Sequence, residues 1–132
     1  MKELLTEAKI ENLDEVLTFV EEEIESSACP PKLVTQIAIA VEEIFVNIAN
    51  YAYNPEVGGA KIRIIADDTV VIEFEDAGRP YNPLEKADPN IHAGIEERQI
   101  GGLGIFMVKN IMDTVDYRYE SGKNILTIKK TW

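Results

Sequence analysis

Apolar residues recur at helical spacing in the first half of this chain and alternate with polar residues in much of the second half. A short strand is expected from Leu4 to Ile10. A helix follows it, with Asn12 as the predicted N-cap and an end near Ser26-Ser27. The apolar positions of this helix lie on one face and are Leu13, Val16, Leu17, Val20 and Ile24. Its other face is rich in glutamate and is expected to face solvent.

The longest predicted element is a helix over Lys32–Tyr53, which follows Pro30-Pro31 and contains no glycine or proline. Its own apolar side chains occupy almost the whole circumference of the helix, with Ile39 and Val46 opposite the main apolar face. This pattern is typical of a buried helix. A polar stripe within an arc of roughly 60° consists of Gln36, Glu43, Asn47 and Asn50. A carboxylate beside apolar walls needs a hydrogen bond, a counter-charge or a metal ion. The stripe therefore indicates either a solvated face or part of a functional site.

Alternating residues in the second half predict two antiparallel hairpins. The strands of the first hairpin are Lys61–Ala66 and Thr69–Glu75. Those of the second are Val115–Glu120 and Ile125–Lys130, joined by a turn at Ser121–Asn124. Helices grouped before hairpins predict an α+β fold, a two-layer α/β sandwich with a mixed, mainly antiparallel sheet and helices on one face. Tyr117 and Tyr119 fit one strand face and indicate no function.

Residues 76–101 show no sustained period and are rich in glycine, proline and charge. A segment of this length inside a small domain is usually a lid, a binding loop or disordered chain. It ends in Gly101-Gly102-Leu103-Gly104, and apolar residues then recur at helical spacing, with Met107 and Met112 expected in the core. Backbone N–H groups at the start of such a helix can bind an anion. Taken alone, a glycine turn of this kind is more often a tight turn than a phosphate site.

The chain has 132 residues, which is enough for one domain with a core, and a single domain over residues 1–132 is expected. Its formal net charge of −11 argues against unaided nucleic-acid binding, because the phosphate backbone would be repelled. Basic proteins or metal-complexed anions are more natural partners. The single cysteine, Cys29, is expected to pack as a small apolar residue. No signal peptide is recognisable, so the cytoplasm is the expected compartment.

Three motifs, in this order, resemble those of the GHKL (Bergerat-fold) ATPase superfamily. The first runs from Glu43 through Asn47 and Asn50 to Tyr53, the second is Glu75-Asp76-Ala77-Gly78-Arg79-Pro80 followed by Tyr81-Asn82-Pro83, and the third is Gly101–Val108. Their joint spacing is a specific match that covers nearly the whole chain. Within the superfamily, the short length and the runs GRPYNP and GGLGIFMV are most similar to the anti-sigma factor serine kinases.

The resemblance implies a role for each central motif residue. Asn47 would hold Mg²⁺ through its amide oxygen. Glu43 would take the proton of an attacking serine hydroxyl. Asp76 would accept a hydrogen bond from the amino group of adenine, and Gly78 would let the base lie against the backbone.

The resemblance also implies that the glycine turn holds the phosphates of ATP through the N–H groups of Gly102, Leu103 and Gly104. Arg98, just before this turn, is either a further phosphate contact or a solvated loop charge. Many relatives have a second glycine where this chain has Pro80, so the base pocket is expected to be stiffer here. The remaining members of the implied ATP site are Asn50, Pro80, Gly101 and Ile105.

As a whole, the resemblance implies an ATP- and Mg²⁺-dependent protein serine/threonine kinase that phosphorylates a STAS-domain anti-sigma antagonist and sequesters a sigma factor. It also implies a homodimer, and no direct contact with nucleic acid or membrane is expected. An alternative of a different class is a nucleotide-gated protein-binding regulator without physiological kinase activity. The ATPase half of a histidine kinase is less favoured, because no helix pair with a phospho-acceptor histidine precedes the motifs.

Overall fold

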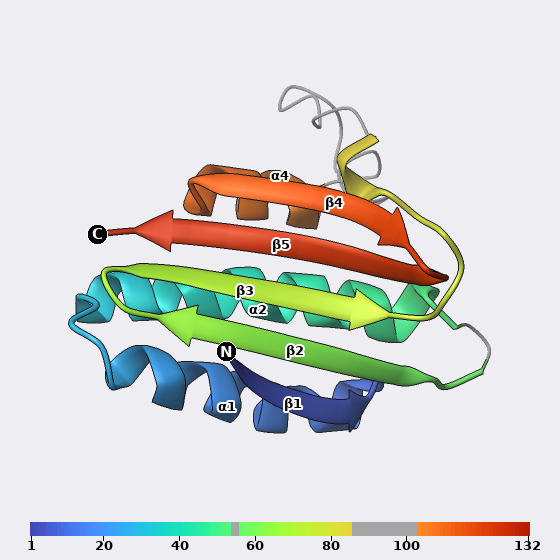
Figure 1. The fold of residues 1–132 in the computed structure, drawn as a ribbon, viewed down its shortest axis with the longest axis horizontal. Coiled ribbons are helices and arrows are strands. Elements are labelled where there is room, and N and C mark those ends of the chain that lie inside the picture. Colours follow the sequence, from blue (N-terminus) through green and yellow to red (C-terminus); the bar gives the residue numbers. More distant parts are fainter. Residues whose placement is uncertain (54–55, 86–102) are drawn as a thin grey trace.

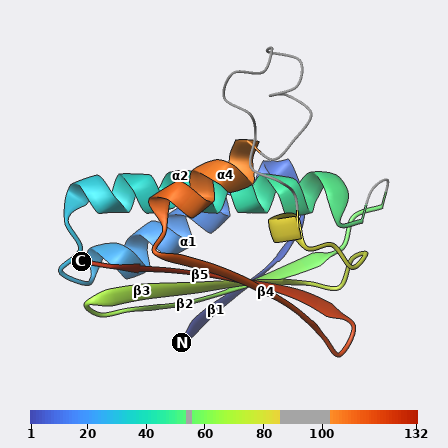
Figure 2. The same cartoon turned by 90° about the horizontal axis from the view of Figure 1, so that it is seen from above.

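A computed structural model of the chain describes residues 1–53, 56–85 and 103–132. Its five strands form one sheet, and the helices lie together on one face of it, as Figures 1 and 2 show. The strands are β1 (Lys2–Glu7), β2 (Gly59–Ala66), β3 (Thr69–Asp76), β4 (Thr114–Glu120) and β5 (Lys123–Thr131). The helices are α1 (Leu13–Glu25), α2 (Pro31–Tyr51) and α4 (Leu103–Ile111), with 3₁₀ turns at Ile10–Asn12 and Pro83–Glu85. The predicted two-layer α+β architecture is confirmed.

The sheet order is β1-β2-β3-β5-β4, and every pairing among these described strands is antiparallel. The expectation of a mixed sheet is therefore wrong. β3 and β4 do run in the same direction, but β5 lies between them and opposes both. Two helices rather than one separate β1 from β2, so the chain returns antiparallel to its first strand.

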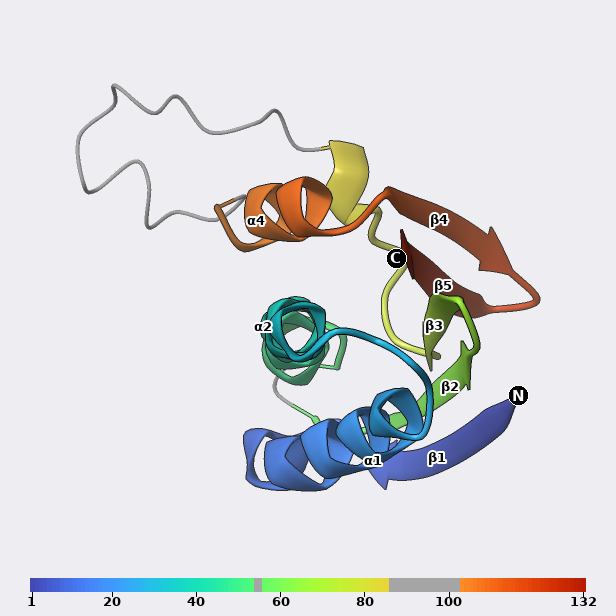
Figure 3. The ribbon, with the colours of Figure 1, turned by 90° about the vertical axis from the view of Figure 1, so that its left-hand side faces the viewer.

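α2 lies across the helix face of the sheet, between α1 and α4 (Figure 3), and supplies much of the core. Its buried residues are Ile37, Ala40, Val41, Ile44 and Phe45. Because α1 and α4 flank α2 without covering its outer side, Ile39 is 37% exposed there, and the predicted burial of the side opposite the main apolar face is wrong at this residue. By length and composition alone α2 could also span a membrane. In this fold it is the central helix of the layer that covers the sheet.

Local hydrogen bonds explain where the predicted boundaries shift. β1 ends at Glu7, because Ile10–Asn12 forms a 3₁₀ turn in place of the predicted end of the strand. Asn12 precedes α1 as predicted, but its side chain accepts no capping hydrogen bond from the helix; its Nδ2 donates to the backbone O of Glu7 at 3.1 Å. Only two residues, Ser121 and Gly122, join β4 to β5, and both have the positive φ that a tight hairpin turn requires.

α4 begins at Leu103, within the predicted glycine turn, and turns one face to the core. Val108 and Met112 are buried on this face, as the prediction for Met112 requires. Met107 is 36% exposed, and its predicted place in the core is wrong, because at about 100° per residue it projects away from the buried face. Cys29 is half-buried and packs against the core as predicted.

The face of the sheet that carries no helix holds a cluster of ion pairs around Arg63 of β2. The Arg63 guanidinium donates to Glu3 of β1 and Glu75 of β3, each at 2.9 Å, and to Glu73 at 3.4 Å. Lys123 of β5 also donates to Glu75, at 3.2 Å. Burial raises the pKa of Glu75, but the hydrogen bonds from Arg63 and Lys123 outweigh it and hold this pKa below its ordinary value.

We expect Arg63→Met to lower the free energy of unfolding at neutral pH by about 1–3 kcal/mol, because it leaves a largely buried carboxylate with one cation. A lowered folded pKa means that the stability from Glu75 is present above its unfolded pKa and is lost as the pH falls through its folded pKa. The difference in free energy of unfolding between the unchanged chain and Arg63→Met should therefore be smaller at about pH 3 than at neutral pH, as measured by urea unfolding. Arg118→Met, which removes an exposed guanidinium of the same face, is the control, and an equal cost there would contradict the prediction.

Candidate functional site

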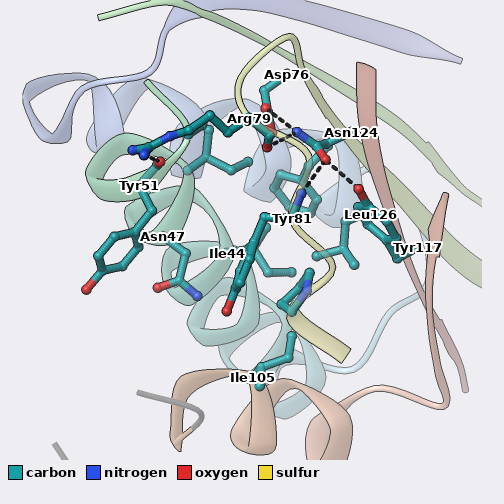
Figure 4. A pocket seen from close by; sticks show the side chains of 14 residues that line it. Ile44, Asn47, Tyr51, Asp76, Arg79, Tyr81, Ile105, Tyr117, Asn124 and Leu126 are labelled. Carbon is teal, nitrogen blue, oxygen red and sulfur yellow. Dashed lines mark hydrogen bonds between the residues drawn. The ribbon is translucent and has the colours of Figure 1, made fainter. Parts of the chain in front are cut away.

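A pocket opens between the C-terminal half of α2, the end of β3, the start of β5 and the start of α4 (Figure 4). Its empty volume is about 580 Å³, part of it open to solvent. Apolar side chains form much of its wall: Ile44, Ile48, Phe74, Ile105 and Leu126. The motif residues Asn47 of α2 and Asp76 of β3 bring polar groups into this wall. The pocket thus joins residues of all three motifs, since Ile105 belongs to the third.

Asp76 is 7% exposed and ends β3 at the pocket. Its Oδ1 accepts hydrogen bonds from the backbone N–H of Gly78, at 2.9 Å, and from Nδ2 of Asn124, at 3.0 Å. Its Oδ2 accepts no hydrogen bond from any residue that the structure describes. Burial raises the pKa of Asp76, and the two donors only partly offset this effect. Contacts within the protein therefore fix one carboxylate oxygen, and the other has no hydrogen-bond donor among the described residues.

Asn124, near the start of β5, is 7% exposed and ties the walls of the pocket together. Besides Asp76, its Nδ2 donates to the backbone O of Gly78 at 3.4 Å and of Arg79 at 2.9 Å. Its Oδ1 accepts hydrogen bonds from the backbone N–H of Tyr81, at 3.1 Å, and from the hydroxyl of Tyr117. One side chain thus holds β3, the loop after it and β4 in a fixed relation (Figure 4).

The alternation pattern did not predict these roles, because it assigned Asn124 to a turn and Tyr117 to a face without function. The two-residue turn extends β5 back to Lys123, so Asn124 shares the inward side of the strand with Leu126. A buried amide at an inward strand position must find hydrogen-bond partners. The inward position of Asn124 becomes visible only when the two-residue turn sets the register, so alternation alone could not have located either residue.

Glu43 of α2 lies against the start of α4. A Cβ atom added to Gly104 would lie 2.6 Å from Oε2 of Glu43, so an alanine there would displace the carboxylate. The first and third motifs are therefore in contact. Glu43 is half-buried and lies outside the wall of the pocket, whereas Asn47, one helical turn later, lines it.

Gly78 packs against the end of α2. A Cβ atom there would lie 2.3 Å from the backbone O of Ala52, and the same oxygen accepts the N–H of Arg79 at 3.0 Å. This close approach fixes the loop after β3 on α2 and explains the glycine without any ligand. The contact of Gly78 with a bound base stays a prediction.

We expect Gly78→Ala to lower the free energy of unfolding by about 2–3 kcal/mol, because backbone atoms of Ala52 would have to move. Urea unfolding measures this change. Gly59→Ala is the matched control, since its added Cβ would lie 3.9 Å from the nearest atom. It should change the free energy of unfolding by less than about 0.5 kcal/mol. Similar values for the two variants would contradict the packing argument.

The other predicted site residues fall into two groups. Asn50 and Pro80 are exposed, and neither lines the pocket. Leu103 and Gly104 form the start of α4, where a helix offers free N–H groups. Outside the described residues lie most of the predicted lid and three predicted members of the ATP site, Arg98, Gly101 and Gly102.

Within the described ranges, no group of three or more His, Cys, Asp or Glu side chains could hold a metal ion. Asn47 offers one neutral amide oxygen to the pocket. Mg²⁺ takes one or two protein oxygens and completes its shell with phosphate oxygens and water. The residues present therefore fit Mg²⁺ when it is bound together with a phosphate group.

The sequence profile of one protein family, described as “Histidine kinase-like ATPase domain”, matches residues 6–130 of this chain. The serine-protein kinase RsbW of Staphylococcus epidermidis is 33% identical over 98 residues, which cover 69% of this chain and 62% of that protein. The serine-protein kinase RsbW of Bacillus thuringiensis (strain Al Hakam) is 24% identical over 106 residues, which cover 73% of this chain and 63% of that protein. The chain thus spans less than two thirds of the length of these relatives.

A crystal structure of the RsbU and RsbW domains of a Mycobacterium tuberculosis protein is similar to this chain in fold. The TM-score is 0.63 at 15% sequence identity, and the match covers 99% of this chain and 32% of that one. At this identity the likeness shows the fold alone, and it agrees with the antiparallel sheet and one-sided helix layer described above.

Proposed function

Because the chain belongs to the histidine kinase-like ATPase domain family, we propose that its pocket binds ATP with Mg²⁺ and that the protein is a serine/threonine protein kinase. The observation that carries the proposal is the buried Asp76, whose Oδ2 is left without a donor from the described chain. Adenine offers an amino group to such an oxygen, and the apolar walls of the pocket suit its faces. The start of α4, against Glu43, offers N–H groups to the phosphates.

In the proposed reaction, Glu43 is the general base. Its carboxylate accepts the proton of a serine hydroxyl while the serine oxygen forms a bond to the γ-phosphorus. The bond from this phosphorus to the β–γ bridging oxygen breaks, and ADP leaves. Asn47 would hold Mg²⁺, and this ion would neutralise part of the phosphate charge. The backbone N–H groups of Leu103 and Gly104, with those of Gly102, orient the phosphates.

The proposed partners follow from the family resemblance and from the relatives, which are serine-protein kinases by name. We propose that a serine of a STAS-domain anti-sigma antagonist accepts the phosphate and that a sigma factor is the sequestered partner. A cytoplasmic homodimer is part of the same proposal. The net charge of −11 favours basic protein surfaces over nucleic acid as partners.

The first test is a calorimetric titration of the chain with ATP, with and without Mg²⁺. Micromolar, Mg²⁺-dependent binding is expected, and transfer of radiolabelled γ-phosphate to a STAS-domain protein then tests the kinase reaction. Binding without transfer would favour the nucleotide-gated regulator. No detectable binding would overturn the ATP site itself.

A further inference from the structure

A groove runs between α1 and α2, apart from the nucleotide pocket. Leu17 of α1 and Val34, Ala38 and Ile39 of α2 give it an apolar floor. Figure 3 shows the two helices side by side, with the strands of the sheet to the right of them. The groove and the pocket at Asp76 share no lining residue. The described part of the chain therefore leaves an apolar surface open that the proposed nucleotide site does not use.

Glutamates border this groove on both helices. Glu21 and Glu25 follow Leu17 at four-residue steps and share one stripe of α1, and Glu42 lies opposite on α2. None of the three glutamates forms an ion pair with a residue that the structure describes. Uncompensated carboxylates beside an apolar floor favour a partner that is apolar on one side and cationic at its flanks.

The charge of the groove decides which surfaces can cover it. Nucleic acids and anionic membranes would be repelled, and a second copy of a chain with net charge −11 would bring like charge to the same place. We propose that the groove binds a basic amphipathic helix of a partner protein. The apolar side of that helix would contact Leu17 and Ile39, and its Lys or Arg side chains would pair with the glutamates. Since α1 has 13 residues, a helix of similar length, about 20 Å, would fill the groove.

A fluorescent peptide of about 14 residues, with leucine on one helical face and lysine on the other, tests the proposal by anisotropy titration at low salt. We expect Glu21→Gln/Glu25→Gln to weaken its binding at least about fivefold, and Ile39→Ser to weaken it similarly. Glu15→Gln/Glu22→Gln removes the same charge from exposed positions of α1 outside the groove and should weaken binding less than about twofold. A peptide with glutamate in place of lysine should not bind.

The single cysteine gives a readout without mutation, because Cys29 also lines the groove. It is half-buried, and burial raises the pKa of its thiol. Saturating lysine peptide should slow alkylation of Cys29 by iodoacetamide at least about fivefold at constant pH. An unchanged rate, equal weakening by the two glutamate pairs, or binding of the glutamate peptide would overturn the proposal. So would protection of Cys29 by high protein concentration alone, which would assign the groove to a second copy.

The groove proposal goes beyond the proposed function and can fail independently of it. The groove variants leave every residue of the nucleotide pocket in place. In the calorimetric titration they should bind ATP like the unchanged chain. If ATP binding is intact and the peptide does not bind, the groove proposal alone is overturned.

Discussion

Glu43→Gln is expected to lower the rate of phosphoryl transfer about 10²–10⁴-fold while ATP affinity stays within about twofold. Glutamine has the size of glutamate but cannot take a proton from the serine hydroxyl. Glu43 lies outside the wall of the pocket and forms no ion pair with a described residue. Its charge is therefore expected to contribute little to the binding of adenine. Single-turnover transfer of γ-phosphate to a serine-containing protein, beside calorimetric ATP binding, separates the two effects.

Glu22→Gln is the control for this experiment, since it removes an exposed carboxylate from the outer side of α1 and should leave both values unchanged. Transfer at a near-normal rate in Glu43→Gln would show that another group accepts the proton. A large loss of ATP affinity instead would mean that the contact between Glu43 and Gly104 shapes the phosphate site rather than the chemistry. The alternative of a binding regulator without kinase activity predicts no transfer in either protein.

The spacing of apolar residues along the chain predicts where most helices and strands lie, but it does not predict how they pack together. α1, α2 and both hairpins were predicted to within a few residues, because each buries one face against the same core. The insertion of β5 between β3 and β4 was not predicted, since neither hairpin pattern contains information on a pairing between distant strands. The exposure of Ile39 has the same origin: the neighbours of α2, not its own composition, decide which sides are covered.

The residues of the site also fall into those that the sequence predicts and those that only the structure reveals. Asp76, Asn47 and Glu43 could be proposed from the sequence, because short motifs carry them at recognisable spacing. Asn124 and Tyr117 could not, because their roles depend on hydrogen bonds between strands and a loop far apart in the chain. Local patterns therefore indicated the chemistry of the pocket, and the tertiary structure supplied the groups that hold it in shape.

Asp76→Asn is expected to weaken ATP binding about 10–100-fold and to change which base the pocket prefers. Oδ1 of an asparagine can keep the hydrogen bonds from Gly78 and Asn124. Its Nδ2 would then replace the free carboxylate oxygen and present a donor to the amino group of adenine. Hypoxanthine has a carbonyl oxygen in place of that amino group, so ITP should lose less affinity than ATP, or gain. Calorimetric titration with both nucleotides measures the ratio.

Asp67→Asn, in the exposed turn between β2 and β3, is the control and should leave both affinities unchanged. Equal ATP affinity in Asp76→Asn and the unchanged chain would remove Asp76 from the site. A parallel loss for ATP and ITP would instead indicate a disturbed pocket. A disturbed pocket should also lower the free energy of unfolding of the variant, whereas a change in base preference should not.

The same substitution is expected to make the folded protein more stable at neutral pH, because burial raises the pKa of Asp76. A folded pKa above the ordinary value of 3.8 means that the stability of the neutral carboxyl is present below that value and is lost as the pH rises through the folded pKa. Asparagine is neutral throughout, so the gain of Asp76→Asn over the unchanged chain should grow across this window and vanish below it. Urea unfolding at a series of pH values measures this difference.

A variant less stable than the unchanged chain at neutral pH would mean that the carboxylate is held by more favourable contacts than Gly78 and Asn124 provide. A more stable variant with weaker ATP binding would identify Asp76 as a residue whose charge serves the ligand at the expense of the fold.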